Sequence, residues 1–377
     1  MTARPFGVNA LFLKPGLVGG TEVHLRELLP RLTALTPGRT WNVYTGSEVS
    51  GFFASMPGVT VRPLPVQAAH RVRRTLAEQT LLPLMLRRDG NAALLNLGGT
   101  ALAAAPCTQV TFIHDLQYHY LPTNFTTPER VALAVTAKLA VRRSAKLIVP
   151  SEETRRTICE TFQAEPDHIR VVPHGTGPEF HPRQKDTDAS DALTLDELGI
   201  RRPYILSVAA ARPHKHLDIV CDAFLASGLD RTHTLVMTGA PGPALETLRL
   251  HPAFRTGTAR WLGWLPERAM PVLMRQAEFL AIASGFEGFC LPALEAAASG
   301  IPVAAVRTPP LPETLGSAAR WVRPGDATAL AGAFREIATD AGVRGELAQA
   351  GILAARRFSW EMSAKQTLDI LLEAAGS

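Results

Sequence analysis

The sequence predicts an α/β protein with two doubly wound domains in tandem, each built on a parallel sheet covered by helices. First, the chain has 377 residues, which exceeds one ordinary hydrophobic core and suits two. Second, short and continuously apolar segments alternate with segments of helical periodicity, as in parallel sheets buried on both faces. Third, a polar segment at residues 181–202 interrupts this alternation, which then begins again.

The first half, residues 1–180, is expected to supply the first sheet. Thr21–Leu35 has apolar residues at helical spacing and follows the first apolar segment, so it predicts a helix. Further helices are expected between several of the later strands. The predicted strands are Phe6–Leu13, Trp41–Thr45, Val59–Leu64, Ala92–Leu97, Val110–His114, Lys146–Pro150 and Arg170–Pro173.

Residues 181–202 are interpreted as a linker with a short helix allowed at its end, and residues 203–357 as the second domain. The strands predicted there are Tyr204–Ala209, Thr234–Gly239, Arg260–Trp264, Glu278–Ala283, Ile301–Val306 and Arg320–Val322. The helices predicted there are Leu217–Leu225, Pro266–Ala277, Pro292–Ser299 and Asp326–Thr339. In such sheets ligands bind beyond the carboxyl ends of the strands, so the cleft between the two domains is the expected site.

Composition excludes several classes of protein. Hydrophobic residues make up 46% and charged residues 19%, which is a globular composition, and no apolar segment has the roughly 18 residues that span a bilayer. The four cysteines lie far apart without a CxxC pair, which favours a reducing cytoplasm over a zinc site or a disulfide framework. Residues 1–180 hold 19 basic against 13 acidic residues, but no basic run with interleaved aromatics indicates a nucleic-acid partner.

The most informative segment is Ser284–Glu295, which reads S-G-F-E-G-F-C-L-P-A-L-E between a predicted strand and a predicted helix. Pro292 suits the first helical position, so the preceding amides point from the positive end of the helix dipole and predict an anion site fit for a diphosphate. Glu295, one turn into the helix, can accept two hydrogen bonds from ribose hydroxyls. Glu287 lies on the loop, near a sugar bound there.

This segment resembles the family 4 glycosyltransferases, whose donor-site motif is E-G-F-G-L-P-x-L-E. The resemblance implies that Glu295 holds the donor ribose, that Glu287 lies beside the reacting sugar, and that the backbone of Gly288–Leu291, with Phe289 and Cys290, meets the donor. Cys290 replaces the usual glycine, which puts the identity of the sugar in question more than the activity.

The resemblance continues before and after this segment. Residues 204–217 resemble the family's V-G-T-x-x-P-R-K-N-L, so Lys215 is the expected cation for the departing diphosphate. His214 stands where the family has arginine, and Arg212 is a candidate replacement; a solvated basic turn is the alternative. Trp264 and Leu265 fall in the segment 263–267, whose backbone meets the base in the family, although a core position for Trp264 is slightly favoured.

In the first half, Gly19 and Gly20 end a glycine-rich loop, 16–21, that resembles the family's phosphate- or acceptor-binding turn; a tight connection is the alternative. His114, in F-I-H-D-L, resembles the histidine that hydrogen-bonds the transferred sugar; a core histidine with its hydrogen bonds satisfied is the alternative. His174, in P-H-G, is not expected to touch substrate. Ser151 is expected to cap a helix. Residues 358–377 resemble the family's terminal helix, which returns to the first domain.

Residues 70–88 place five arginines around leucines, which allows either contact with an anionic membrane or ordinary packing within the domain.

The whole resemblance implies a GT-B fold, two Rossmann-like domains facing across a cleft. It further implies a cytoplasmic, metal-independent, retaining hexosyltransferase without a cofactor, acting on a nucleoside diphosphate sugar and a glycan or lipid-linked acceptor. The H-D-L, P-H-G and P-x-K variants lean towards mannosyl- or rhamnosyltransferases of surface polysaccharide assembly. A GT-B epimerase or phosphorylase, and a non-catalytic nucleotide-sugar-binding protein, stay open as alternatives.

Overall fold

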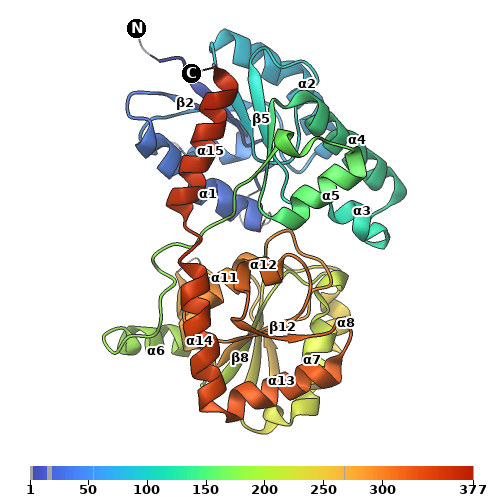
Figure 1. The fold of residues 1–377 in the computed structure, drawn as a ribbon, viewed down its shortest axis with the longest axis vertical. Helices are drawn as coiled ribbons and strands as arrows, with labels where there is room; N and C mark the ends of the chain where they lie inside the picture. Colours follow the sequence, from blue (N-terminus) through green and yellow to red (C-terminus); the bar gives the residue numbers. More distant parts are fainter. Residues whose placement is uncertain (1–2, 15–18, 54, 267, 377) are drawn as a thin grey trace. The chain divides into compact units, whose positions relative to one another are not determined.

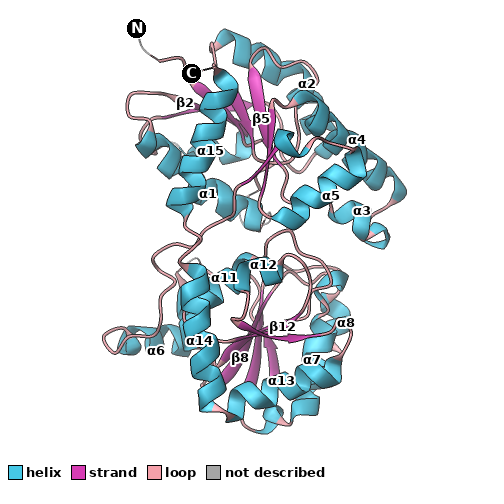
Figure 2. Ribbon diagram, in the orientation of Figure 1, coloured by secondary structure: helices cyan, strands magenta, loops and turns pink. Residues whose placement is uncertain are grey.

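A computed structural model describes residues 3–14, 19–53, 55–266 and 268–376. The chain divides into two compact units, and we describe each separately (Figure 1). Unit 1 comprises Met1–His174 together with Trp360–Ser377, and unit 2 comprises Gly175–Ser359. In each unit helices flank a central group of strands, so both are layered α/β folds (Figure 2).

Unit 1 contains a parallel sheet of seven strands in the order β3-β2-β1-β4-β5-β6-β7. Its strands are β1 (Phe6–Asn9), β2 (Trp41–Gly46), β3 (Val59–Leu64), β4 (Ala93–Asn96), β5 (Thr108–Phe112), β6 (Lys146–Val149) and β7 (Ile169–Val171). Its α-helices are α1 (Gly20–Leu35), α2 (Arg71–Arg88), α3 (Gln117–Tyr120), α4 (Thr127–Arg143), α5 (Glu152–Phe162) and α15 (Trp360–Ala375). The order of strands reverses its direction between β1 and β4.

Helix α15 is an integral part of unit 1. Its residues Ala364, Leu368 and Leu371 are buried in the same hydrophobic cluster as strands β1, β2, β4 and β5. Glu361 also forms an ion pair with Arg31 of α1 at 2.8 Å. At α5, the Ser151 hydroxyl accepts a hydrogen bond from Thr154 N, which confirms the helix cap that the sequence predicts.

Unit 2 contains a parallel sheet of six strands in the order β10-β9-β8-β11-β12-β13. Its strands are β8 (Tyr204–Val208), β9 (Thr234–Thr238), β10 (Ala259–Trp261), β11 (Phe279–Ile282), β12 (Val303–Val306) and β13 (Ala319–Val322). Its α-helices are α6 (Asp188–Glu197), α7 (Leu217–Ser227), α8 (Leu245–Arg249), α9 (Pro252–Arg255), α10 (Ala269–Gln276), α11 (Leu291–Ala298), α12 (Leu311–Leu315), α13 (Ala327–Thr339) and α14 (Ala341–Ala355). The order reverses between β8 and β11, as in a Rossmann fold.

Each strand that the sequence predicts is present, with bounds that differ by a few residues. The segment 181–202 differs more from its interpretation as a linker, because α6 lies in its middle. The Asp191 carboxylate of α6 is buried and pairs with the Arg275 guanidinium and, at 2.7 Å, with the Gln276 amide of α10. These buried polar contacts make the segment part of unit 2.

None of the helices formed by the described residues is long and apolar enough to cross a membrane.

Candidate functional site

The reversal of strand order in unit 2 brings together the two loops that carry the predicted donor residues. Residues 209–216 follow β8, and residues 283–290 follow β11, the strand that pairs with β8 in parallel. Both loops begin at the carboxyl ends of neighbouring strands. After β8 the chain continues to β9 on one side of this pair of strands, and after β11 it continues to β12 on the other side. In open α/β sheets this is the place where ligands bind.

Lys215 and Glu287 meet at this point. Lys215 Nζ donates a hydrogen bond to Glu287 Oε1 at 2.7 Å, and the two side chains are 17% and 10% exposed. They are separated by 72 positions in the sequence, so the fold, and not local structure, forms the pair. A charge-assisted bond of this length in a partly desolvated place fixes the ammonium group and the carboxylate relative to one another.

The close approach of the two loops explains why residue 285 is a glycine. Its backbone N–H donates to the carbonyl oxygen of His214 at 2.8 Å. A Cβ atom at this position would lie 3.0 Å from His216 Nε2, which is closer than ordinary packing allows. Residue Ser284 is held from the other side, because Thr308 Oγ1 donates to its carbonyl oxygen at 2.8 Å. The loop is thus fixed at both ends of the Ser284–Gly285 peptide.

Cys290 precedes α11 as its N-cap residue and adopts a left-handed backbone conformation, with φ of 73°. Glycine reaches this region without strain, whereas other residues incur a cost of about 1–2 kcal/mol. This backbone conformation explains why the family motif has glycine at this position. The present chain adopts the same conformation with a cysteine. Burial raises the pKa of the Cys290 thiol well above its usual range, and the Glu287 carboxylate adds to this, so the thiol stays protonated.

The sequence predicts Pro292 as the first residue of a helix. In the structure α11 begins at Leu291, so Pro292 is its second residue. The side chains of Phe289 and Leu291 are buried, and the Phe289 ring lies 6.0 Å from the ring of Phe358. Only the backbone of these two residues is therefore suited to contact a ligand. Glu295 is one turn into α11 and partly exposed, as the prediction of a ribose contact requires.

The segment around Lys215 contains two further predicted residues. Arg212 is exposed and lies three residues from Lys215, whose backbone N–H donates to the Arg212 carbonyl oxygen at 3.0 Å. His214 is buried, and burial, with the nearby Lys215 charge, lowers its pKa to about 4. A neutral imidazole does not supply the charge of the family's arginine, so Arg212 is the candidate for that charge.

Trp264 is 50% exposed, so its interpretation as a core residue is wrong. It follows Gly263, whose carbonyl oxygen accepts hydrogen bonds from Gly239 N at 3.0 Å and Thr238 Oγ1 at 2.7 Å at the end of β9. Leu265 is partly buried. These bonds fix the segment at the carboxyl edge of the sheet and leave the indole ring available to a flat ligand. Glu267, part of the same motif, lies outside the described residues.

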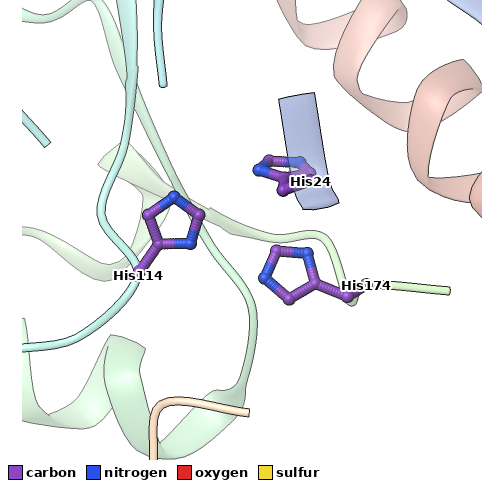
Figure 3. Close-up of side chains that lie close together, drawn as sticks. All are labelled: His24, His114 and His174. Atoms are coloured by element: carbon purple, nitrogen blue, oxygen red, sulfur yellow. The ribbon is translucent and has the colours of Figure 1, made fainter. Parts of the chain in front are cut away.

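In unit 1, His114 follows β5 and lies near the imidazole rings of His24 and His174 (Figure 3). Its Nε2 is 3.0 Å from the carbonyl oxygen of Leu97, and its ring centre is 5.4 Å from that of His24 and 5.6 Å from that of His174. Burial lowers the pKa of His114 to about 4, so the imidazole is neutral at physiological pH. A neutral imidazole can exchange hydrogen bonds with a sugar hydroxyl.

His24 belongs to none of the predicted motifs. It lies on α1, and burial, together with His174 and His114, lowers its pKa well below the usual value. Its position in the first two turns after the glycine-rich loop is the only signal that was present in the sequence. Gly19, with φ of 64°, precedes α1 and Gly20 begins it, while Gly16 lies outside the described residues.

Helix α2 divides its apolar side chains between two environments. Leu82 and Leu86 are buried in unit 1, whereas Val72, Leu76 and Leu84 are 75%, 60% and 66% exposed. Packing within the domain therefore describes one face of the helix, and contact of the other face with an anionic membrane stays a prediction. The neighbouring α4 adds exposed valines, and Arg71 of α2 pairs with Glu129 of α4 at 3.0 Å.

Comparison with known families and proteins covers both units. Residues 18–180 match the model of Glycosyltransferase Family 4, and residues 196–356 match the model of Glycosyl transferases group 1. The chain is 26% identical to O-antigen chain mannosyltransferase B of Escherichia coli over 69% of both chains. It is 28% identical to a D-inositol 3-phosphate glycosyltransferase of Salinispora tropica over 66% of this chain, which spans 55% of that relative's length.

Solved structures resemble the whole chain in fold. WaaG, a glycosyltransferase involved in lipopolysaccharide biosynthesis, gives a TM-score of 0.78 at 17% identity and covers 97% of this chain and 99% of its own. HepE of Anabaena, solved in complex with UDP-glucose, gives a TM-score of 0.75 at 17% identity and covers 98% of this chain and 99% of its own. At these identities the likeness establishes the fold alone.

Proposed function

Because the chain belongs to the family 4-like glycosyltransferases of the GT-B fold, we propose that it transfers a hexosyl group from a nucleoside diphosphate sugar to a glycan or lipid-linked acceptor. A GDP-mannose-like donor is favoured, since the relative from E. coli is a mannosyltransferase of O-antigen chains. The observation that carries the proposal is the Lys215–Glu287 pair at the strand reversal of unit 2, next to the amino terminus of α11.

The donor is proposed to lie along the loops that follow β8, β9 and β11. Its diphosphate would face the ammonium of Lys215 and the first amides of α11, with Arg212 as a second cation. Its ribose would face Glu295, and its base the exposed ring of Trp264 and the backbone at Leu265. Glu287, held by Lys215, would steady the sugar or the positive charge that develops on it.

We propose that the reaction retains the configuration of the sugar without a covalent enzyme intermediate and without a metal. The bond between the anomeric carbon and the diphosphate oxygen breaks, and the acceptor oxygen bonds to the same face of that carbon. The acceptor proton passes to a donor phosphate oxygen. His114 would hydrogen-bond the transferred sugar. Positioning and charge stabilisation then supply most of the catalysis.

The exposed face of α2 is proposed to rest on an anionic membrane where lipid-linked acceptors are found. Val72, Leu76 and Leu84 supply apolar contact, and the flanking arginines face the lipid phosphates. Flotation with vesicles that contain an anionic lipid tests this. A Leu76→Glu, Leu84→Glu variant should lose binding, whereas Leu193→Glu, an equally exposed residue of α6, should keep it. Equal flotation of all three proteins would contradict the membrane proposal.

The transferase proposal is tested in two steps. A thermal-shift screen across UDP-, GDP- and dTDP-sugars identifies the donor, and NMR of the product then gives the anomeric configuration. Consumption of donor only with an added acceptor, and independence from free phosphate, would separate a transferase from an epimerase and a phosphorylase. An inverted product would contradict retention, and binding without any turnover would favour a nucleotide-sugar-binding protein.

A further inference from the structure

Three histidines of unit 1 come from distant parts of the chain and face a common space. His24 lies on α1, His114 follows β5 and His174 follows β7. Each offers one ring nitrogen, and these three nitrogens lie within 4.8 Å of one another (Figure 3). The ring centres of His24 and His174 are 4.5 Å apart. Three imidazoles so close together form a set of ligand atoms typical of divalent transition metals.

His24 lacks the hydrogen bonds that a buried imidazole normally makes. Its side chain is fully buried, and neither Nδ1 nor Nε2 has a hydrogen-bond partner within the described part of the chain. Its ring is packed against Phe112, at 4.4 Å between ring centres, and Trp360, at 5.8 Å. Leaving a buried donor or acceptor unsatisfied destabilises the folded protein, and a bound cation would offset this through the ring nitrogen that carries the lone pair.

His114 is oriented in the manner of a metal ligand. In the neutral ring, Nε2–H donates to the carbonyl oxygen of Leu97 at 3.0 Å, so Nδ1 carries the lone pair. Metal-binding histidines usually donate their second ring N–H to a carbonyl or carboxylate in this way. Burial lowers the pKa of all three histidines, so each is in the neutral form that a metal requires.

We propose that His24, His114 and His174 bind one divalent transition-metal ion of the Zn²⁺ class. With Zn–N bonds of about 2.0–2.1 Å, tetrahedral coordination would place the nitrogens about 3.4 Å apart, so the three rings must move closer by rotation of their side chains. Three protein ligands leave one coordination position for water or another group.

The ion would act as an inhibitor, since it would occupy His114 Nδ1. The inhibition rests on the proposed function, in which His114 hydrogen-bonds the sugar and the transfer needs no metal. Micromolar Zn²⁺ should therefore reduce turnover of the wild-type enzyme and have a smaller effect on a His24→Ala variant.

Cobalt tests the site independently of turnover. Full-length protein, freed of metal with a chelator, is titrated with Co²⁺ and its visible ligand-field bands are recorded. We expect tetrahedral-type bands that saturate at one equivalent, at least 100-fold weaker binding in His24→Ala and in His174→Ala, and unchanged binding in His168→Ala. His168 is a matched control in the same unit, with Nε2 3.1 Å from the carbonyl oxygen of Val141.

X-ray absorption of the Zn²⁺-loaded wild-type protein covers the case that a buried substitution prevents folding. It should show scattering from three imidazoles. No saturable cobalt bands, equal binding by His24→Ala and wild type, or fewer than three imidazoles around zinc would overturn the metal site. If the cobalt spectrum appears but Zn²⁺ leaves turnover unchanged, the metal site stands and the proposed role of His114 in transfer is wrong.

Discussion

The ion pair between Lys215 and Glu287 allows a prediction from its geometry. At a separation of 2.7 Å, two unit charges attract by about 6 kcal/mol in a medium with an effective dielectric constant of 20. Much of this is offset by the removal of both groups from water, because the side chains are only 17% and 10% exposed. We expect a net coupling of about 1–2 kcal/mol between the two residues.

A double-mutant cycle with Lys215→Met and Glu287→Gln measures this coupling in the free energy of unfolding, from urea denaturation. Each single variant should lose about 1–3 kcal/mol, because it removes the opposite charge beside a charged group that is largely buried. The double variant should be more stable than the sum of the two losses predicts, by the coupling energy.

The pair Arg249–Glu246 of α8 provides a control cycle. Its charges are 3.0 Å apart, but the side chains are 56% and 82% exposed. Exposed pairs of this kind contribute about 0.5 kcal/mol or less. If the losses at Lys215 and Glu287 are additive, as in this control, then the pair does not hold the two loops together and the reasoning is refuted.

Three further predictions concern the same unit and the histidines. Gly285→Ala should lower the affinity for nucleoside diphosphates about tenfold in calorimetry, because its Cβ would press on His216, whereas Gly332→Ala, with open space around it, should leave affinity unchanged. Trp264→Ala should change stability by less than about 0.5 kcal/mol yet weaken nucleotide binding about tenfold, and unchanged affinity would remove the proposed base contact. As pH falls from 6.5 to 4, unfolding by urea should become easier by up to about 3 kcal/mol from His114 alone, since its folded pKa of about 4 lies below the unfolded value of 6.5. The stability is fully present above pH 6.5, and a flat profile across this window would contradict the burial of neutral histidines.

The sequence predicted both sheets because their strands are continuously apolar and alternate with helical periodicity. It also placed Lys215 and Glu287 on loops after strands, and the reversal between β8 and β11 then brings those loops together. Strand order follows from long-range pairing that no local pattern encodes. For the same reason the hydrogen bond from Gly285 N to the carbonyl oxygen of His214 was not predictable.

Three errors have a physical explanation. Trp264 was favoured as a core residue because large aromatic side chains are usually buried, but it follows a glycine in a loop at the sheet edge. Residues 181–202 were interpreted as a linker because they are polar. The pairing with Arg275 allows Asp191 to be buried, and it thereby makes the segment part of unit 2. His24 was not predicted as a site residue, because its position after the glycine-rich loop indicates little until distant segments of the chain place other imidazoles beside it.

Isothermal titration of UDP and GDP tests the central claim most directly, with the wild-type chain and with Glu295→Ala. We predict that at least one of the two nucleotides binds the wild type at one site per chain, and that loss of the Glu295 carboxylate, which is proposed to hold two ribose hydroxyls, weakens binding at least tenfold. Equal affinity in the two proteins, or no binding of either nucleotide to the wild type, would contradict the assignment of the donor site to unit 2.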